Sequence, residues 1–359
     1  MNATLQCLCH IEKFVNYFKY NKFLINKVGN NIDYLSSSFK ILIENLWPEN
    51  LSLNNQKYYA PYEFKKKISK MNPLFEGIAA NDSKDLVNFI IMTLHKELNK
   101  ANNKNNLQKN DDIELDQTNK TLIFNNFSNE FISNNISVIS DLFYSMNCSV
   151  TECFNCHIKL YNFQIYFFII FPLEEVRKYK IQNLNNKLFN LYNNCFSNNQ
   201  FNNNNNFLIN NNEVNLFDCF EYDRKVNVMC GDNTMYCRYC NRDTNCGMQT
   251  YLVTGPEILI LILNRGQGIE FDVKINFVEY LNLSNYIEYT NTGCNYKLIG
   301  VITHIGESGM GGHFISYCRD PITELWYKYN DAIINQVDNF QTEVINFAMP
   351  YLLFYQKIF

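Results

Sequence analysis

The sequence lacks any apolar run long enough to cross a membrane. Its most apolar stretch, residues 163–172, has the length of a buried strand, whereas a membrane helix needs about 20 mostly apolar residues. The first residues also lack the basic and then apolar segments of a secretory signal, because Asn2, Gln6 and Glu12 interrupt them. We therefore expect neither a membrane span nor a signal peptide.

The sequence also lacks an excess of positive charge. It has 31 Lys and Arg against 35 Asp and Glu, with a net charge of −4. It therefore has no excess of basic residues of the kind that binds nucleic acid. Its 13 cysteines are an odd number in a chain of 359 residues, which argues against the disulfide framework of a small secreted protein. We expect a reduced, intracellular protein of the cytoplasm, the nucleus or both.

Helical and strand-like patterns occupy different parts of the chain. Apolar residues recur at helical spacing in the first hundred residues, and Ser83 is expected to cap a helix over residues 85–98. From about residue 160, short β-branched or aromatic runs indicate strands, at residues 165–170, 257–263 and 297–303. Helices followed by strands predict an α+β fold.

Two polar segments interrupt this pattern, residues 99–119 and 193–212, and both are rich in asparagine. Neither can bury enough apolar surface to offset the entropy lost on ordering. We expect both to be disordered insertions.

The most informative segment, residues 311–330, predicts a β-hairpin. Asp320 and Pro321 fit the first two positions of a β-turn. If Asp320 and Thr323 flank the turn, the register places Asn330 directly across from His313. Opposed side chains have Cβ atoms about 5 Å apart, so the amide oxygen of Asn330 is close enough to hold an imidazole N–H. A general-base histidine needs such a partner to fix its tautomer.

Gly311 and Gly312 precede this histidine and would let a substrate backbone come close to the ring. These residues alone do not decide between a catalytic pair and an ordinary hairpin that carries a histidine and an asparagine.

The segments 306–320 and 326–331 closely resemble the histidine box of the ubiquitin-specific proteases, and residues 296–306 and 350–355 match that family too. The resemblance implies that His313 is the catalytic base, that Asn330 orients it and that Asp331 assists. It covers nearly the whole chain and implies one catalytic domain over residues 1–359, with a papain-like α+β fold. A helical thumb would span about residues 1–130, and a β-rich palm and zinc-bearing β fingers about 131–359.

Residues 1–8, Met-Asn-Ala-Thr-Leu-Gln-Cys-Leu, resemble the second half of the family's cysteine box. The alignment places the nucleophilic cysteine two residues before Met1. Cys7 lies eight positions further along, roughly 12 Å by helical rise, and we expect it to be a buried structural cysteine; Cys9 is equally unable to reach. The chain as written is therefore expected to be inactive.

Two explanations remain open for this pattern. Either the start lies inside the motif of an intact enzyme, or the protein is a non-catalytic pseudoprotease that binds ubiquitin. We favour the first, because the rest of the site is undegraded.

Two Cys-x-x-Cys pairs predict a metal site: Cys153 with Cys156, and Cys237 with Cys240. Four thiolates suit one tetrahedral zinc, and a closed set of four ligands is typical of a structural site. Two unrelated pairs of core cysteines are the weaker alternative. The resemblance supports zinc, because the family's fingers carry such a four-cysteine site.

Residues 75–86 resemble the family segment that contains Gln-Gln-Asp, with Ala80 and Asn81 in place of the two glutamines. Asp82 keeps its place and Asp85 replaces the usual glutamate. The resemblance implies that both acids meet arginines of the ubiquitin tail, beside Gly311 and Gly312. A helix N-cap with an acidic first turn explains Asp82 and Asp85 equally well.

The resemblance thus implies a thiol-dependent deubiquitinase whose partners are ubiquitin and ubiquitinated proteins. A zinc-dependent interaction domain unrelated to ubiquitin is a weaker alternative, and the histidine hairpin argues against it.

Overall fold

The computed structural model describes residues 1–21, 34–48, 59–77, 81–101, 117–195, 212–266, 272–290, 293–306, 312–346 and 349–358, with side chains in α9 described as far as residue 186. Most of the two predicted disordered insertions, residues 102–116 and 196–211, lies outside this description. The described beginning of the second insertion differs from the prediction, because residues 193–195 belong to a helix. None of the described helices combines the length and the apolar character of a membrane span.

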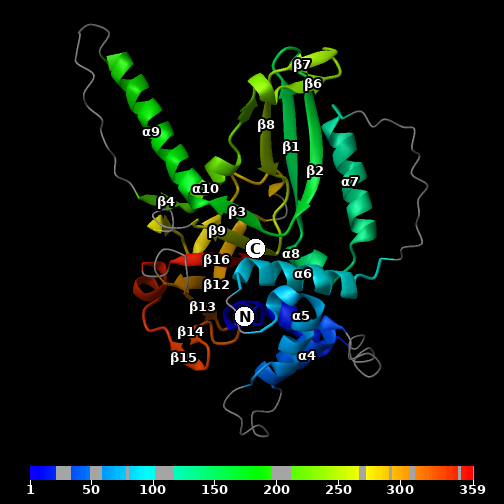
Figure 1. Cartoon of the computed structure of the whole chain (residues 1–359), viewed down its shortest axis with the longest axis vertical. Coiled ribbons are helices and arrows are strands. Elements are labelled where there is room, and N and C mark those ends of the chain that lie inside the picture. The colour runs from blue at the N-terminus through cyan, green and yellow to red at the C-terminus, as the bar shows by residue number, and fades with distance from the viewer. Residues whose placement is uncertain are drawn as a thin grey trace.

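The N-terminal part is helical (Figure 1). Its elements are α1 (Asn2–Leu8), α2 (Glu12–Tyr20), α4 (Leu35–Leu46), α5 (Tyr62–Met71), the 3-10 helix η1 (Pro73–Phe75) and α6 (Ser83–Leu98). Phe14 and Phe18 of α2 lie against Phe39 of α4, and all three are fully buried. These rings give the helices a common core, which explains why short helices of modest intrinsic propensity persist here.

The predicted cap of α6 is wrong by one residue. Asp82, not Ser83, is the N-cap, and its side chain accepts the backbone N–H of Lys84. Ser83 is the first helical residue and is buried. Both residue types cap helices well, so the local sequence alone does not separate them.

A four-stranded sheet with the order β2-β1-β8-β5 follows the helices. It is preceded by α7 (Lys120–Asn134) and α8 (Val138–Phe143) and contains β1 (Ser145–Cys153), β2 (Lys159–Tyr166), β5 (Asn227–Met229) and β8 (Cys246–Leu252). Phe124 and Phe127 of α7 pack on Phe163 of β2. The far end of this sheet carries the 3-10 helix η2 (Gly231–Asn233) and a ribbon of β6 (Met235–Cys237) and β7 (Arg242–Thr244) (Figure 1).

An eight-stranded sheet forms the other half of the molecule, with the order β15-β14-β13-β12-β16-β9-β3 and with β11 paired to β12. Its strands are β3 (Ile169–Pro172), β9 (Ile258–Asn264), β11 (Tyr280–Asn282), β12 (Asn295–Ile305), β13 (His313–Arg319), β14 (Trp326–Asn330), β15 (Ile333–Gln336) and β16 (Pro350–Ile358). The predicted strand at 165–170 is divided between β2 and β3, whereas the other two predicted strands match β9 and β12.

Both faces of this sheet are covered, which explains the continuous apolar run of β9. Ile258, Ile260 and Ile262 join the core formed with α1, α2, α4 and α6, whereas Leu259 and Leu261 join a second core on the opposite face. That face is covered by α9 (Leu173–Cys195) and α10 (Leu216–Asp223); the elements nearby are β4 (Glu213–Asn215), β10 (Lys274–Asn276) and the π-helix η5 (Gln341–Ile345). Alternation along a strand therefore separates two cores.

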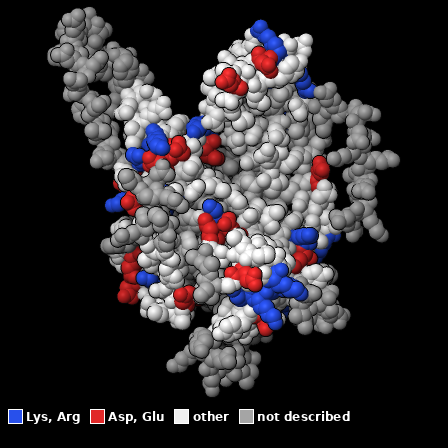
Figure 2. All heavy atoms as spheres, in the orientation of Figure 1, with Lys and Arg blue, Asp and Glu red and all other residues white. Residues whose placement is uncertain are grey.

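Basic and acidic side chains lie near one another on the face shown in Figure 2. Several of the described charges are paired, for example Arg224 with Glu221 at 2.6 Å and Arg319 with Glu279 at 2.7 Å. The predicted α+β organisation, helices first and strands afterwards, is confirmed.

Candidate active site and metal centre

The hairpin of β13 and β14 carries the predicted histidine, but its predicted register is wrong by two residues. Ser316 pairs with Tyr329, so Asn330 lies diagonally from His313 rather than directly across from it. The cause is the loop, which has four residues instead of two: Asp320 N–H donates to the carbonyl of Leu325 over 2.8 Å. This longer loop contains Glu324 in the left-handed region, at φ 63°.

His313 and Asn330 nevertheless meet, because long side chains reach a diagonal neighbour. His313 Nε2 lies 2.7 Å from Oδ1 of Asn330 and 3.6 Å from Oδ2 of Asp331. An amide oxygen only accepts, so Nε2 carries the proton and donates it to Asn330. Nδ1 is then the unprotonated nitrogen, which is the form that a general base requires.

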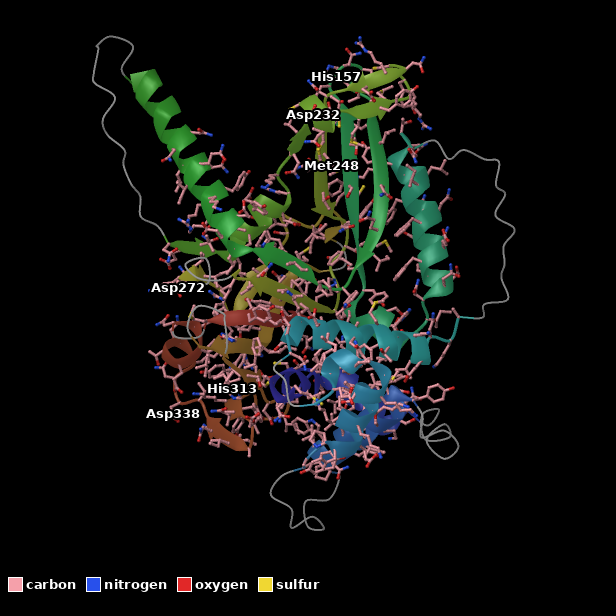
Figure 3. All side chains as sticks on the ribbon, viewed as in Figure 1. His157, Asp232, Met248, Asp272, His313 and Asp338 are labelled. Atoms are coloured by element: carbon pink, nitrogen blue, oxygen red, sulfur yellow. The ribbon has the colours of Figure 1, made fainter. Side chains whose placement is uncertain are left out.

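A pocket of about 300 Å³ lies beside this pair. Met1 at the start of α1, Asp82 before α6, and Gly312 and His313 at the start of β13 line it, together with Asp331. Asn2 Nδ2 donates to Oδ1 of Asp331 over 2.9 Å, which ties α1 to the turn after β14. The pocket therefore lies where the helical half meets the eight-stranded sheet, and Figure 3 marks His313 at this junction.

Gly312 occupies a position where only glycine fits. Its φ is +154°, and an added Cβ would lie 2.3 Å from the ring of His304 and 2.5 Å from the carbonyl oxygen of Ile305. His304 lies on β12, and its ring contacts that of Phe314 edge-on. Gly311 lies outside the described residues.

Asp82 lines the pocket, but both of its carboxylate oxygens already have partners. Oδ1 accepts the N–H of Lys84, and Oδ2 accepts the hydroxyl of Tyr351 on β16 over 2.6 Å. This second bond joins α6 to the eight-stranded sheet. Asp85 is not among the pocket-lining residues; burial, aided by the nearby charge of Asp82, raises the pKa of its carboxyl group.

Cys7 and Cys9 are buried and do not line the pocket. The Sγ of Cys7 lies 3.7 Å from that of Cys318 on β13. Burial raises the pKa of both thiols, Cys7 and Cys9, so both stay protonated at neutral pH. Neither has the exposure or the low pKa that a nucleophilic cysteine needs.

The four predicted metal ligands come together at the far end of the four-stranded sheet. Their Sγ atoms all lie within 4.8 Å of one another, with 3.8 Å between Cys153 and Cys240 and 3.7 Å between Cys156 and Cys237. A regular tetrahedron with metal–sulfur bonds of about 2.3 Å has edges of about 3.8 Å. The donor set therefore fits a zinc ion.

Local backbone geometry supports this fit. The residue after each pair, His157 and Asn241, is in the left-handed region, at φ 59° and 53°, and so turns the chain around each pair. His157 Nδ1 faces Glu152 at 3.5 Å, so the imidazole is directed at a carboxylate. Figure 3 shows that His157 lies far from His313, at the opposite end of the molecule, so the metal centre is separate from the histidine pocket.

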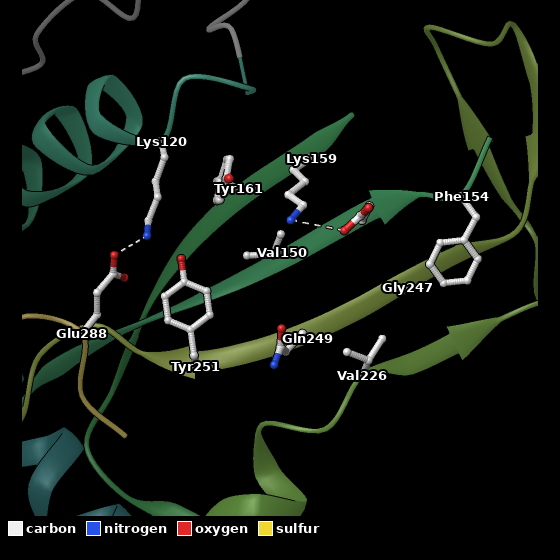
Figure 4. A pocket seen from close by; sticks show the side chains of 11 residues that line it. Lys120, Val150, Phe154, Lys159, Tyr161, Val226, Gly247, Gln249, Tyr251 and Glu288 are labelled. Carbon is white, nitrogen blue, oxygen red and sulfur yellow. Dashed lines mark hydrogen bonds and ion pairs between the residues drawn. The ribbon is translucent and has the colours of Figure 1, made fainter. Parts of the chain in front are cut away.

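A larger pocket of about 400 Å³ lies on the four-stranded sheet (Figure 4). Lys120 pairs there with Glu288, and Lys159 pairs with Glu152 at 3.3 Å. None of its described lining residues is a cysteine or a histidine. The smaller pocket beside His313 is therefore the candidate active site.

Residues 1–355 match the sequence model of the family described as Ubiquitin carboxyl-terminal hydrolase. The chain belongs to this family. It is 25% identical to ubiquitin carboxyl-terminal hydrolase 2 of Bos taurus over 99% of this chain and 53% of that protein. Ubiquitin carboxyl-terminal hydrolase 5 of Saccharomyces cerevisiae is 24% identical over 100% of this chain and 43% of that protein. The chain thus spans about half the length of the curated relatives it matches.

Two solved structures share the fold. One is the SAGA Ubp8/Sgf11/Sus1/Sgf73 DUB module bound to ubiquitin aldehyde, with a TM-score of 0.66 and 20% identity over 100% of this chain and 67% of that chain. The other is the SAGA DUB module bound to monoubiquitin, with a TM-score of 0.68 and 19% identity over 100% of this chain and 66% of that chain. The family resemblance and the predicted fold, a papain-like α+β arrangement of thumb, palm and fingers, are confirmed. The thumb boundary near residue 130 stays a prediction.

Sequence reasoning missed two contacts at the site, the bond of Asn2 with Asp331 and that of Tyr351 with Asp82. Both partners of each bond lie in segments that resemble the family's motifs, and this resemblance was the one sign in the sequence that these residues belong to the site. Which residues would touch could not be predicted, because the partners are 329 and 269 positions apart.

Proposed function

We propose that the protein is a cysteine-type deubiquitinase, which removes ubiquitin from protein conjugates. The observation that carries the proposal is the hydrogen-bonded pair of His313 and Asn330 at a pocket also lined by the first residue of α1. A residue preceding Met1 would enter this pocket beside His313, and in the family's cysteine box the nucleophile lies two residues before the position of Met1.

In the proposed reaction His313 acts first as a base and then as an acid. Nδ1 takes the thiol proton as the sulfur attacks the carbonyl carbon of ubiquitin's last glycine. The tetrahedral intermediate collapses, His313 protonates the leaving lysine amine, and a thioester remains. Water then attacks the thioester, with His313 as its base, and releases the ubiquitin carboxylate and the thiol. Asn330 keeps the ring in the required tautomer throughout, and Asp331 is a further acceptor near Nε2.

Ubiquitin's C-terminal tail is the proposed occupant of the pocket beside His313. Gly311 and Gly312 allow the tail's backbone to approach the ring, and Asp82 and Asp85 supply negative charge for its arginines. Asp82 lines the pocket and is held in place by Tyr351, which supports a contact role alongside its role as an N-cap. The structural neighbours bound to ubiquitin aldehyde and to monoubiquitin support ubiquitin as the partner, and ubiquitinated proteins would be the substrates.

We also propose that the metal is zinc, held by Cys153, Cys156, Cys237 and Cys240. Four ligands close the coordination shell, so zinc would hold the two Cys-x-x-Cys turns together and take no part in catalysis. Such thiolates persist in a reducing compartment, which supports a cytoplasmic or nuclear location.

The test is hydrolysis of a fluorogenic ubiquitin substrate by the protein carrying Cys-Tyr and the preceding residues of the family's cysteine box in front of Met1. We expect hydrolysis that falls by orders of magnitude in His313→Ala, because base and nucleophile act as a unit. Asn330→Ala is expected to lose less, since it orients the ring without transferring protons. Binding of ubiquitin without hydrolysis would favour the non-catalytic alternative, and hydrolysis unaffected by His313→Ala would refute the proposed site.

A further inference from the structure

A short chain of hydrogen bonds joins the two halves of the metal centre. Asn155 lies between Cys153 and Cys156, and its Nδ2 donates to Sγ of Cys240 in the other pair over 3.1 Å. Arg242, two residues after Cys240, donates from Nη2 to Oδ1 of the same amide over 3.0 Å. Asn155 and Arg242 thus form a bridge between the two Cys-x-x-Cys turns without being ligands.

The chemistry of the three groups fixes the direction of this bridge. A guanidinium group has only donors, so the amide must turn its oxygen to Arg242 and its N–H to Cys240. Four thiolates around one divalent ion carry a net negative charge. An N–H directed at a sulfur, with a cation behind it, stabilises that charge.

A second polar side chain contacts a different ligand. The hydroxyl Oγ1 of Thr244, a buried residue, lies 3.3 Å from Sγ of Cys153, and it is the donor when Cys153 is a thiolate, because a thiolate can only accept. The two donors therefore act on different ligands. Removing Asn155 leaves the bond to Cys153 intact, which allows the contribution of the bridge to be measured separately.

We propose that Asn155 and Arg242 are positioning residues of the metal centre, which hold Cys240 in its ligating position and slow the loss of the ion. This inference rests on the zinc proposed above. At other zinc sites, mutation of residues that hydrogen-bond to the ligands without binding the metal weakens metal binding by roughly 10- to 100-fold. The bond from Asn155 in the first Cys-x-x-Cys turn to Cys240 in the second holds the two turns together. It therefore opposes their separation, which must occur when the ion leaves.

The experiment measures the rate at which purified, zinc-loaded protein releases zinc to a chromophoric chelator. We expect Asn155→Ala to release zinc about tenfold faster than wild type. Arg242→Gln is also expected to release zinc faster than wild type, by the same factor or a smaller one. The double variant is expected to match Asn155→Ala, because Arg242 acts through the Asn155 amide. Arg242→Lys keeps a cationic donor and is expected to release zinc at close to the wild-type rate. Asn162→Ala is the matched control, an exposed asparagine on β2 of the same sheet, and is expected to release zinc at the wild-type rate.

A second readout reports on the ligand itself. In the cobalt-loaded protein, Asn155→Ala is expected to move the thiolate-to-cobalt absorption to lower energy, because a sulfur that loses a hydrogen bond is a stronger electron donor. Circular dichroism checks that the variants keep the wild-type fold.

Wild-type release rates and an unchanged cobalt spectrum in Asn155→Ala would overturn the positioning role while leaving zinc in place. A double variant whose effect is the product of the two single effects would overturn the serial bridge. Folded wild-type protein that contains no zinc and takes none up would overturn the zinc proposal itself, and the bridge with it.

Discussion

Replacing Gly312 with alanine is expected to misplace His313 without unfolding the protein. The new Cβ would lie 2.3 Å from the His304 ring and 2.5 Å from the backbone oxygen of Ile305, whereas ordinary contacts begin at 3.4 Å. The His304 side chain can rotate away, but the backbone of β12 cannot. Relieving the contact therefore needs a shift of about 1 Å at the residue next to His313, and a misplacement of that size costs on the order of 100-fold in rate.

The assay is kcat/KM for a fluorogenic ubiquitin substrate, measured on the protein that carries the cysteine box in front of Met1. Gly231→Ala is the matched control. Gly231 also has a positive φ, +61°, but an added Cβ there meets nothing within 4 Å, and it lies in η2, remote from the pocket. Both variants bear the strain of a non-glycine residue at positive φ, on the order of 1–3 kcal/mol, and only Gly312→Ala is expected to lose activity. Equal kcat/KM in the two variants would refute the reasoning that the close contact with β12 positions His313.

Three further predictions concern stability. Burial raises the pKa of Asp223 from 3.8 to about 6, so its contribution to stability is complete below pH 4 and is lost as pH rises through 6, a change of about 3 kcal/mol. Asp223→Asn should therefore unfold at higher urea concentration than wild type at pH 7.5, with a smaller difference at pH 4.5; an equal difference at both pH values would contradict this. Cys237→Ser should reduce bound zinc from one ion per chain to none and lower the melting temperature, and an unchanged metal content by atomic absorption would contradict the four-sulfur site. Tyr351→Phe removes the hydroxyl bonded to Asp82 and should lower the free energy of unfolding by about 1.5 kcal/mol, measured by urea denaturation; a loss below about 0.5 kcal/mol, the extrapolation error for a protein of about 5 kcal/mol stability, would contradict this contribution.

The sequence predicted those features that depend on local pattern or on motifs. The β-branched apolar run at residues 257–263 predicted the strand β9, and the spacing of Cys153, Cys156, Cys237 and Cys240 predicted four sulfurs around one point. The hairpin register was missed because Glu324, a non-glycine residue in the left-handed region, extends the loop in a way that turn preferences do not reveal.

Long-range contacts were the least predictable part of the site. The bond of Asn2 with Asp331 exists only because α1 packs against β13 and β14. The prediction of one strand at 165–170 was wrong for a related reason. The two halves of this segment belong to β2 and β3, which join different sheets. A continuous apolar run does not reveal where the chain passes from one sheet to the other.

The reaction of this protein with ubiquitin bearing a C-terminal electrophile tests the central claim most directly. We predict that the form with the family's cysteine box in front of Met1 gains the mass of one ubiquitin at the cysteine two residues before Met1, and that His313→Ala slows this labelling by orders of magnitude. Residues 1–359 alone should not be labelled, because Cys7 and Cys9 are buried away from the pocket. Labelling at Cys7 or Cys9, or labelling that does not depend on His313, would contradict the account.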